Sequence, residues 1–130
     1  IPSEIGMLQK LEKLHFGGNS LTGSIPTEIG MLVNLRNLAL LYNDIGGTIP
    51  SEIGFLSNME QLNLRNNDLN GDVPSEIGLL KGMKCLNLKS NDNLGAIPSE
   101  ITHLTLLTEG VNYFYRRRSL TTLSNQQCRA

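Results

Sequence analysis

The chain has 130 residues, of which 39% are hydrophobic, and a formal net charge of −1 at pH 7. A chain of this length is expected to form one domain. Its balanced charge provides no overall field that would attract nucleic acid or an anionic membrane surface. No apolar run approaches the roughly 18 residues that a membrane-spanning helix requires. The chain starts at Ile1, inside the pattern described next and without an initiating Met, so we expect it to be part of a longer protein.

The chain is built from a repeat of 24 residues. In each copy an Ile-Pro or Val-Pro pair precedes Ser or Thr, then Glu, then Ile, and the prolines are Pro2, Pro26, Pro50, Pro74 and Pro98. A fixed period of this length is the signature of a solenoid, in which each coil packs only on its neighbours. We therefore predict a partial repeat at 1–10 and full repeats at 11–34, 35–58, 59–82 and 83–106.

Each full repeat opens with a segment that predicts a short strand. In the second of them, Leu38 and Leu40 alternate with Asn37, Ala39 and Leu41. Successive side chains of a strand point to opposite faces. The two leucines are therefore expected to face the core, and the other three residues are expected to face solvent.

The chain must then turn out of the strand, and an Asn stands at this place in every full repeat. Its amide can bond backbone groups of its own coil and of the neighbouring coil. We predict a buried structural ladder of Asn19, Asn43, Asn67 and Asn91.

The return half of each repeat carries a Gly and then the Pro-containing segment. The glycines, which permit a bend in the chain, are Gly23, Gly47, Gly71 and Gly95. Pro26 and its equivalents are predicted to be the first residue of a short helical turn. The Glu two residues later then lies in the first turn, where negative charge is favoured.

The pattern changes in the last full repeat and ends after it. In Asn91-Asp92-Asn93-Leu94 the Leu stands one place late, so Asn93 is expected to take the inward position. Beyond residue 106, positions that should be apolar hold Gly110 and Asn112, and Tyr115 stands in place of the Asn. We interpret 107–130 as a divergent C-terminal cap or a tail.

The shared form L-x-x-L-x-L-x-x-N-x-L-x-G-x-I-P-x-E-I-G-x-L resembles the leucine-rich repeat, and its L-x-G-x-I-P segment resembles the plant-type subclass. That subclass occurs in the ectodomains of plant receptor kinases and in polygalacturonase-inhibiting proteins. The resemblance implies an α/β solenoid, a right-handed superhelix with a parallel sheet on the concave side and short helical or 3-10 turns on the convex side. It also implies an extracellular or cell-surface location and a protein or peptide ligand.

The candidate binding surface is the solvent side of the predicted concave sheet. Its residues differ from repeat to repeat while the framework stays constant, as a site-specific binding surface requires. Free drift of exposed positions would give the same variation. The candidate residues are Lys13, His15, Asn37, Leu41, Tyr42, Gln61, Asn63, Arg65, Asn87 and Lys89. Tyr42, Leu41 and Arg65 form the best anchor trio, because Tyr and Arg dominate interface hot spots.

No catalytic or cofactor motif is present, so we predict a non-enzymatic protein without a cofactor or metal. Glu4 and its four equivalents could form a column of carboxylates, but single carboxylates do not converge on one calcium ion. His15 and His103 fall at different places in their repeats. Cys85 and Cys128 are two free thiols or one bridge, and we interpret Cys85 as a bystander thiol. The basic run 116–118 is too short for a nucleic-acid-binding domain.

Two other functions are considered for a solenoid of this kind, an enzyme inhibitor and an ice-binding protein. The resemblance to polygalacturonase-inhibiting proteins implies, as an alternative, an inhibitor of a secreted cell-wall-degrading enzyme. An ice-binding surface would need a regular Thr or Asn column on the exposed sheet, and the columns are irregular here, with His15 beside Ala39.

Overall fold

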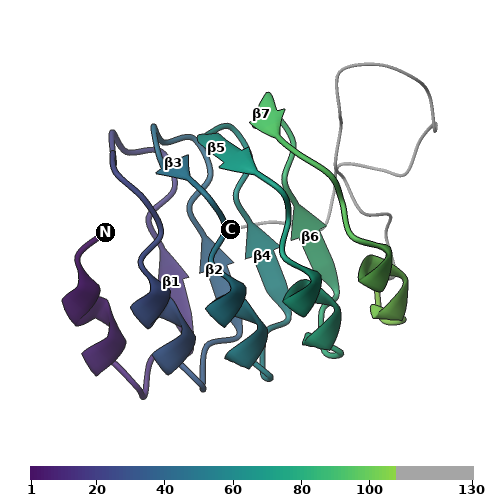
Figure 1. The fold of residues 1–130 in the computed structure, drawn as a ribbon. Coiled ribbons are helices and arrows are strands. Elements are labelled where there is room, and N and C mark those ends of the chain that lie inside the picture. The colour runs from purple at the N-terminus through teal and green to yellow at the C-terminus, as the bar shows by residue number, and fades with distance from the viewer. Residues whose placement is uncertain (108–130) are drawn as a thin grey trace.

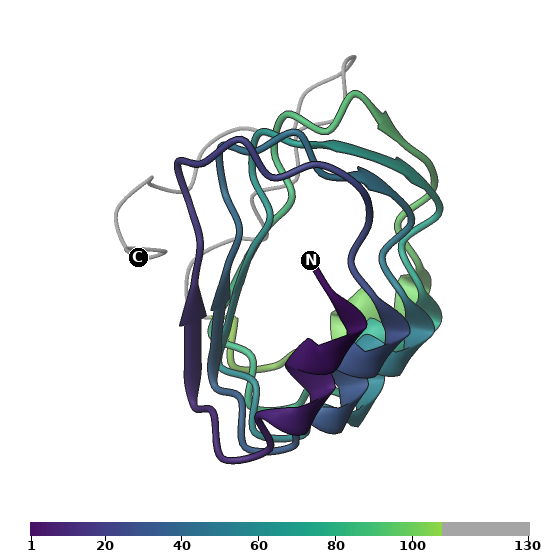
Figure 2. The same ribbon diagram turned by 90° about the vertical axis from the view of Figure 1, so that its left-hand side faces the viewer.

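The fold is a stack of similar coils, seen from the side in Figure 1 and along the stack in Figure 2. The computed structural model describes residues 1–107, so the predicted cap or tail lies outside the described residues apart from Leu107. Each coil places a strand on one side of the stack and a 3-10 helix on the other. The helices are η1 (Ser3–Met7), η2 (Thr27–Met31), η3 (Ser51–Phe55), η4 (Ser75–Leu79) and η5 (Ser99–His103).

The strands form two parallel sheets. The main sheet has the order β1-β2-β4-β6, and its strands are β1 (Lys13–His15), β2 (Asn37–Ala39), β4 (Gln61–Asn63) and β6 (Cys85–Asn87). A smaller sheet of order β3-β5-β7 follows the turn out of the main sheet, and its strands are β3 (Gly46–Gly47), β5 (Asp68–Gly71) and β7 (Asn93–Leu94). The parallel sheets and the 3-10 turns confirm the predicted solenoid class.

In the main sheet, equivalent residues of successive 24-residue repeats pair with one another. Leu38 pairs with Leu14 on one side and with Leu62 on the other, and Leu62 pairs with Leu86. Residues 24 apart are therefore neighbours across the sheet. The inward side chains of all coils join one hydrophobic core, in which Leu38, Leu40, Ile45, Ile53 and Leu56 of the second repeat are at most 1% exposed.

Three asparagines tie neighbouring coils together. The Nδ2 of Asn67 donates to the carbonyl of Leu64 in its own coil, at 3.1 Å, and to that of Leu40 in the preceding coil, at 2.9 Å. Its Oδ1 accepts a hydrogen bond from the backbone N–H of Ile45, at 3.1 Å. Asn43 and Asn91 repeat this arrangement on their own preceding coils.

Asn19 occupies the same place in the first full repeat but differs from the other three. It is exposed, and its Nδ2 bonds only carbonyls of its own coil, at 3.0 Å from that of Phe16 and 3.3 Å from that of Gly17. The ladder position is therefore filled in every full repeat, but its bonds cross between coils only from Asn43 onward.

The 3-10 helices stack at close range because a Gly stands at the contact. A Cβ added to Gly54 would lie 2.7 Å from the Glu76 Cβ and 2.9 Å from the Glu76 carbonyl oxygen. Gly30 and Gly78 face the Glu of the next coil in the same way. The glycine of each Glu-Ile-Gly segment is thus required by the approach of the following coil.

The structure corrects two details of the return path. Pro26 has extended dihedral angles, φ −72° and ψ 149°, so it caps η2 and the helix begins at Thr27. Its carbonyl accepts the first bond of the turn, from the N–H of Ile29 at 3.0 Å. The prediction that Pro is the first helical residue was therefore wrong by one position.

The irregular repeat also differs from the prediction. Leu94, not Asn93, is buried, and Asn93 is exposed. The strand pairing shifts to accommodate the displaced Leu: β7 pairs with β5 through Asn70–Asn93 and Gly71–Leu94. Burial of an apolar side chain outweighs strict repeat spacing here. Gly95 correspondingly lacks the positive φ that Gly23, Gly47 and Gly71 share.

Replacing Asn67 by Ala is expected to lower the free energy of unfolding by about 1–3 kcal/mol, because it leaves the buried Ile45 N–H without its acceptor. Urea denaturation followed by circular dichroism measures this. Asn19→Ala is the matched control, with a smaller loss because its side chain is exposed and makes no bond to a preceding coil. Equal losses for the two variants would contradict the role assigned to the inter-coil bonds.

Replacing Gly54 by Ala is expected to cost about 1–3 kcal/mol of stability, because the new methyl group must displace the backbone of the next coil. Gly46→Ala is the control: its added Cβ would meet nothing closer than 3.7 Å, and its φ is not positive. Thermal unfolding of both variants tests the prediction. A Gly54→Ala protein as stable as wild type would show that the helices do not stack as tightly as described.

Candidate binding surface

The solvent side of the main sheet, together with the residue column that follows each strand, is called the main-sheet face below. It corresponds to the concave face of the prediction. Lys13 and His15 are exposed on the first strand. The half-buried candidates on this face are Asn37, Leu41, Gln61, Arg65 and Lys89.

Asn63 and Asn87, predicted to offer exposed side chains to a partner, are instead buried, at 5% and 8% exposure. Asn63 lies between Ala39 and Asn87 of the two neighbouring strands, which in a sheet are about 4.8 Å away, and Asn87 pairs with Asn63. The side-chain oxygen of Asn63 also accepts the N–H of Arg65, and that of Asn87 accepts the N–H of Lys89. These asparagines support the residues that follow them.

A second column, immediately before the Asn ladder, has an unusual backbone. Tyr42, Asn66 and Ser90 have φ of 56°, 55° and 58°, and Gly18 at the equivalent place has φ 73°. The left-handed conformation costs an L-residue roughly 1–2 kcal/mol. Inter-coil bonds hold it, since Tyr42 N–H donates to the Arg65 carbonyl and Asn66 N–H to the Lys89 carbonyl, both at 2.9 Å.

The left-handed backbone turns Tyr42 outward, beside Arg65. The Tyr42 side chain is large and the residue is 48% exposed. The guanidinium carbon of Arg65 lies 5.3 Å from the centre of the Tyr42 ring, within the range of a cation–π interaction. The Arg65 Nε also donates to the Asn66 Oδ1 at 3.0 Å. Two residues of the predicted anchor trio are therefore in direct contact.

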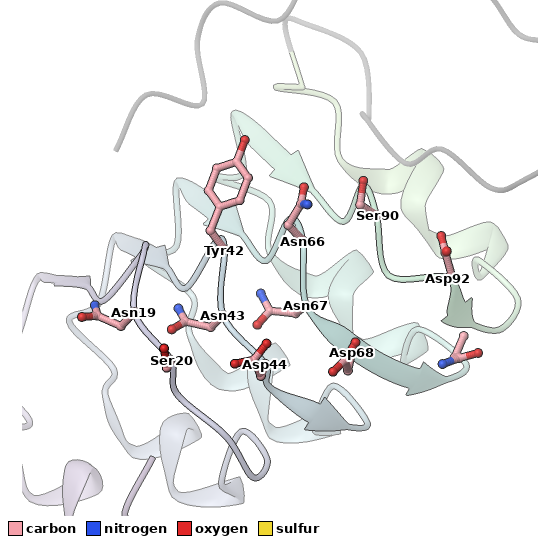
Figure 3. Close-up of a pocket in the computed structure, with 11 residues that line it drawn as sticks. Asn19, Ser20, Tyr42, Asn43, Asp44, Asn66, Asn67, Asp68, Ser90 and Asp92 are labelled. Carbon is pink, nitrogen blue, oxygen red and sulfur yellow. The ribbon is translucent and has the colours of Figure 1, made fainter.

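A polar groove of about 840 Å³ runs along the turn between the main sheet and the smaller sheet. Figure 3 shows the side chains that line it in parallel rows, one row per position of the repeat. The lining residues are Asn19, Ser20, Tyr42, Asn43, Asp44, Asn66, Asn67, Asp68, Ser90, Asp92 and Asn93. Tyr42 belongs to both surfaces, because it contacts Arg65 on one side and borders the groove on the other.

The sequence reasoning did not single out the acidic row of this groove. Asp44, Asp68 and Asp92 recur at intervals of 24, each directly after an Asn of the ladder. That regularity was visible in the sequence. It carried no signal for a groove, because the groove depends on the direction in which the chain leaves the sheet.

Other candidate chemistry is not gathered into a site. Cys85 is buried and disulfide-bonded, so of the two alternatives the bridge is correct, and the interpretation of Cys85 as a bystander thiol was wrong. His15 lies on β1 and His103 on η5, at opposite sides of the coil. Within residues 1–107 no three His, Cys, Asp or Glu side chains are grouped to hold a metal ion. No helix in that range is long and apolar enough to span a bilayer.

A row of alternating charges borders the main sheet where each strand begins. Glu60 accepts Arg36 Nη1 at 2.8 Å and Lys84 Nζ at 2.7 Å, from the coils on either side. The hydrogen bond from Lys84 has the largest effect on the pKa of the Glu60 carboxyl. Together with the contacts to Arg36 it lowers the pKa of this group below its ordinary value of 4.5, although desolvation opposes the shift.

The chain is similar to known leucine-rich-repeat proteins. The leucine-rich-repeat family profile matches residues 10–32 and 58–80. A comparison with curated proteins found no match. Among solved structures, the plant peptide hormone receptor RGFR1 in complex with RGF2 is 34% identical, with a TM-score of 0.80 over 88% of this chain and 18% of that one.

Two further structures show the same likeness. The ectodomain of the membrane receptor kinase GASSHO1/SCHENGEN3 from Arabidopsis thaliana, in complex with Casparian strip integrity factor 2, is 37% identical, with a TM-score of 0.79 over 82% of this chain and 13% of that one. A chain of the BIR3–SERK2 complex from Arabidopsis thaliana is 38% identical, with a TM-score of 0.73 over 78% and 54%. The chain thus spans less than two thirds of each of these proteins.

Glu60→Gln is expected to lower stability at pH 7 by up to about 1 kcal/mol, as for other partly exposed ion pairs. Because the folded-state pKa of Glu60 is lowered, the wild-type advantage is present above pH 4.5 and is lost as pH falls through the folded-state value. Urea denaturation of both proteins between pH 7 and pH 3 measures this, and about 1 M NaCl should also reduce the difference. A difference independent of pH and salt would contradict an ionic origin.

Proposed function

Because this chain is a leucine-rich-repeat protein of the plant type, we propose that it is a non-enzymatic scaffold that holds a protein or peptide along its main-sheet face. The contact of Tyr42 with Arg65 carries the proposal. A bulky residue held in a left-handed conformation is a local cost that persists only where surrounding structure imposes it, and such positions cluster at functional sites. The left-handed backbone at Tyr42 places its aromatic ring beside the guanidinium of Arg65, at the solvent-exposed surface.

The shape of the surface favours an extended partner. The main-sheet face crosses four coils with one left-handed column along its edge, and the polar groove continues beyond that column. A ligand lying along the stack would meet a different residue at each coil: Gly18, Tyr42, Asn66 and Ser90 in this column alone. Each coil could thus contact a different residue of the ligand, as expected for an extended peptide or an exposed loop.

The contrast between the two sides of the stack supports the assignment. On the helical side the exposed position after each Gly is always large and apolar, namely Met7, Met31, Phe55 and Leu79. These side chains extend toward the Gly of the preceding coil, as Met31 does toward Gly6 and Phe55 toward Gly30. The repeated position therefore serves stacking. On the main-sheet face, Leu41 packs over Gly17 of the preceding coil, whereas Tyr42 and Arg65 contact each other.

An enzyme inhibitor could use the same face. The resemblance to polygalacturonase-inhibiting proteins remains the basis of that alternative. An assay of polygalacturonase with and without the chain decides it, since inhibition would identify the protein partner as an enzyme.

Panning of a phage-displayed random peptide library on the immobilised chain tests the proposal. The wild-type protein should enrich a family of related peptides. The double variant Tyr42→Ala, Arg65→Ala should reduce their recovery by at least about 10-fold, as expected when central aromatic and Arg contacts are truncated.

The double variant Met31→Gln, Leu79→Gln is the control, because it changes exposed side chains on the helical side only. Its peptide recovery should equal that of wild type. Peptides that bind the Tyr42→Ala, Arg65→Ala variant as well as wild type would place binding elsewhere, and the main-sheet face would lose its assigned role. Circular dichroism of each variant verifies that the solenoid is intact.

A further inference from the structure

The left-handed column separates two surfaces of opposite charge. Among the described residues, the outward positions of the main-sheet face carry Lys13, Arg65 and Lys89 and no Asp or Glu. The groove on the other side carries the Asp row and no Lys or Arg. The formal charge of the side chains therefore has opposite signs on the two sides of the column.

Two contacts fix the orientation of the Arg65 side chain. Its Nε is bonded to the Asn66 Oδ1, and its guanidinium carbon lies over the Tyr42 ring, 5.3 Å from the ring centre. A cation–π contact uses none of the N–H groups of a guanidinium, so the two Nη atoms keep their capacity to donate. Within residues 1–107 no acceptor bonds the two Nη atoms. Arg65 is half-buried, so its side chain loses less conformational entropy when a ligand binds than a fully mobile side chain would.

We propose that Arg65 is the anchor for an acidic side chain of the bound peptide, a carboxylate held in bidentate fashion by the guanidinium. This inference rests on the proposed function and names the chemistry of the partner. Planar, two-fold recognition of carboxylate is the contact for which a guanidinium is suited. Lys89 stands at the same repeat position one coil further and adds positive charge beside it.

The Asp row determines the side on which the acidic group binds. A carboxylate drawn toward Arg65 is repelled from Asp44 and Asp68 on the far side of Tyr42 and Asn66. The peptide residue next to the acidic one therefore passes over the left-handed column and meets the groove as a neutral or basic residue. The ligand is a segment with an acidic residue at the Arg65 position and no second acidic residue over the groove.

The peptides enriched on wild-type protein provide the test. They should share one Asp or Glu, and changing it to Asn or Gln should weaken binding measured by isothermal titration calorimetry about 10-fold, as for one charge-assisted hydrogen-bonded contact. On the Arg65→Gln variant the same peptide change should alter the dissociation constant by less than about 2-fold. Arg65→Lys should recover only part of the affinity, because Lys lacks the planar pair of donors.

Lys81→Gln is the matched control, since it removes one positive charge from an exposed residue outside the main-sheet face. It should leave the effect of the acidic residue intact at about 0.15 M salt. Enriched peptides without a shared acidic residue, or an Asp effect that persists in Arg65→Gln, would overturn the anchor while leaving the scaffold function standing. Failure to enrich any peptide would remove the scaffold function for peptides and the anchor with it.

Discussion

The structure depends on hydrogen bonds that run from one coil to the next at the turn out of the main sheet. An amide side chain is the group that can complete this turn, because it donates and accepts at once. Asn43, Asn67 and Asn91 each close their own coil and bond the preceding one. Coils of 24 residues bury too little apolar surface alone, so the bonds and the shared core between coils make the array the unit of stability.

Backbone hydrogen bonds between coils hold the special backbone of the candidate site. Gly18, Tyr42 and Asn66 each donate their N–H to a carbonyl of the following coil, and each has a left-handed conformation. The framework imposes the conformation without imposing a side chain. Gly18, Tyr42, Asn66 and Ser90 all accept it. The outward orientation of Tyr42 therefore follows from the hydrogen bonds between stacked coils.

The two long sides of the stack have separate tasks. On the helical side, Gly54 and its equivalents allow the helices to approach until a side chain would collide with the next coil. On this side the Gly of one coil contacts the Glu and the exposed apolar side chain of the next coil, so packing constrains these positions. On the main-sheet face the strand leucines already satisfy the core, so the outward positions can differ. A binding surface with its own charge distribution can develop there without loss of stacking.

The sequence by itself determined the period, the inward leucines, the ladder positions and the class of fold, because each follows from a residue type repeated in register. It also predicted Tyr42 and Arg65 as anchors from residue chemistry alone, and the structure places these two side chains in contact. Only the tertiary structure decided which outward positions are accessible: Asn63 and Asn87 are buried, and Leu94 is buried in place of Asn93. Accessibility, the left-handed column and the acidic groove are properties of adjacent coils, and contacts between residues 22 to 27 positions apart set them.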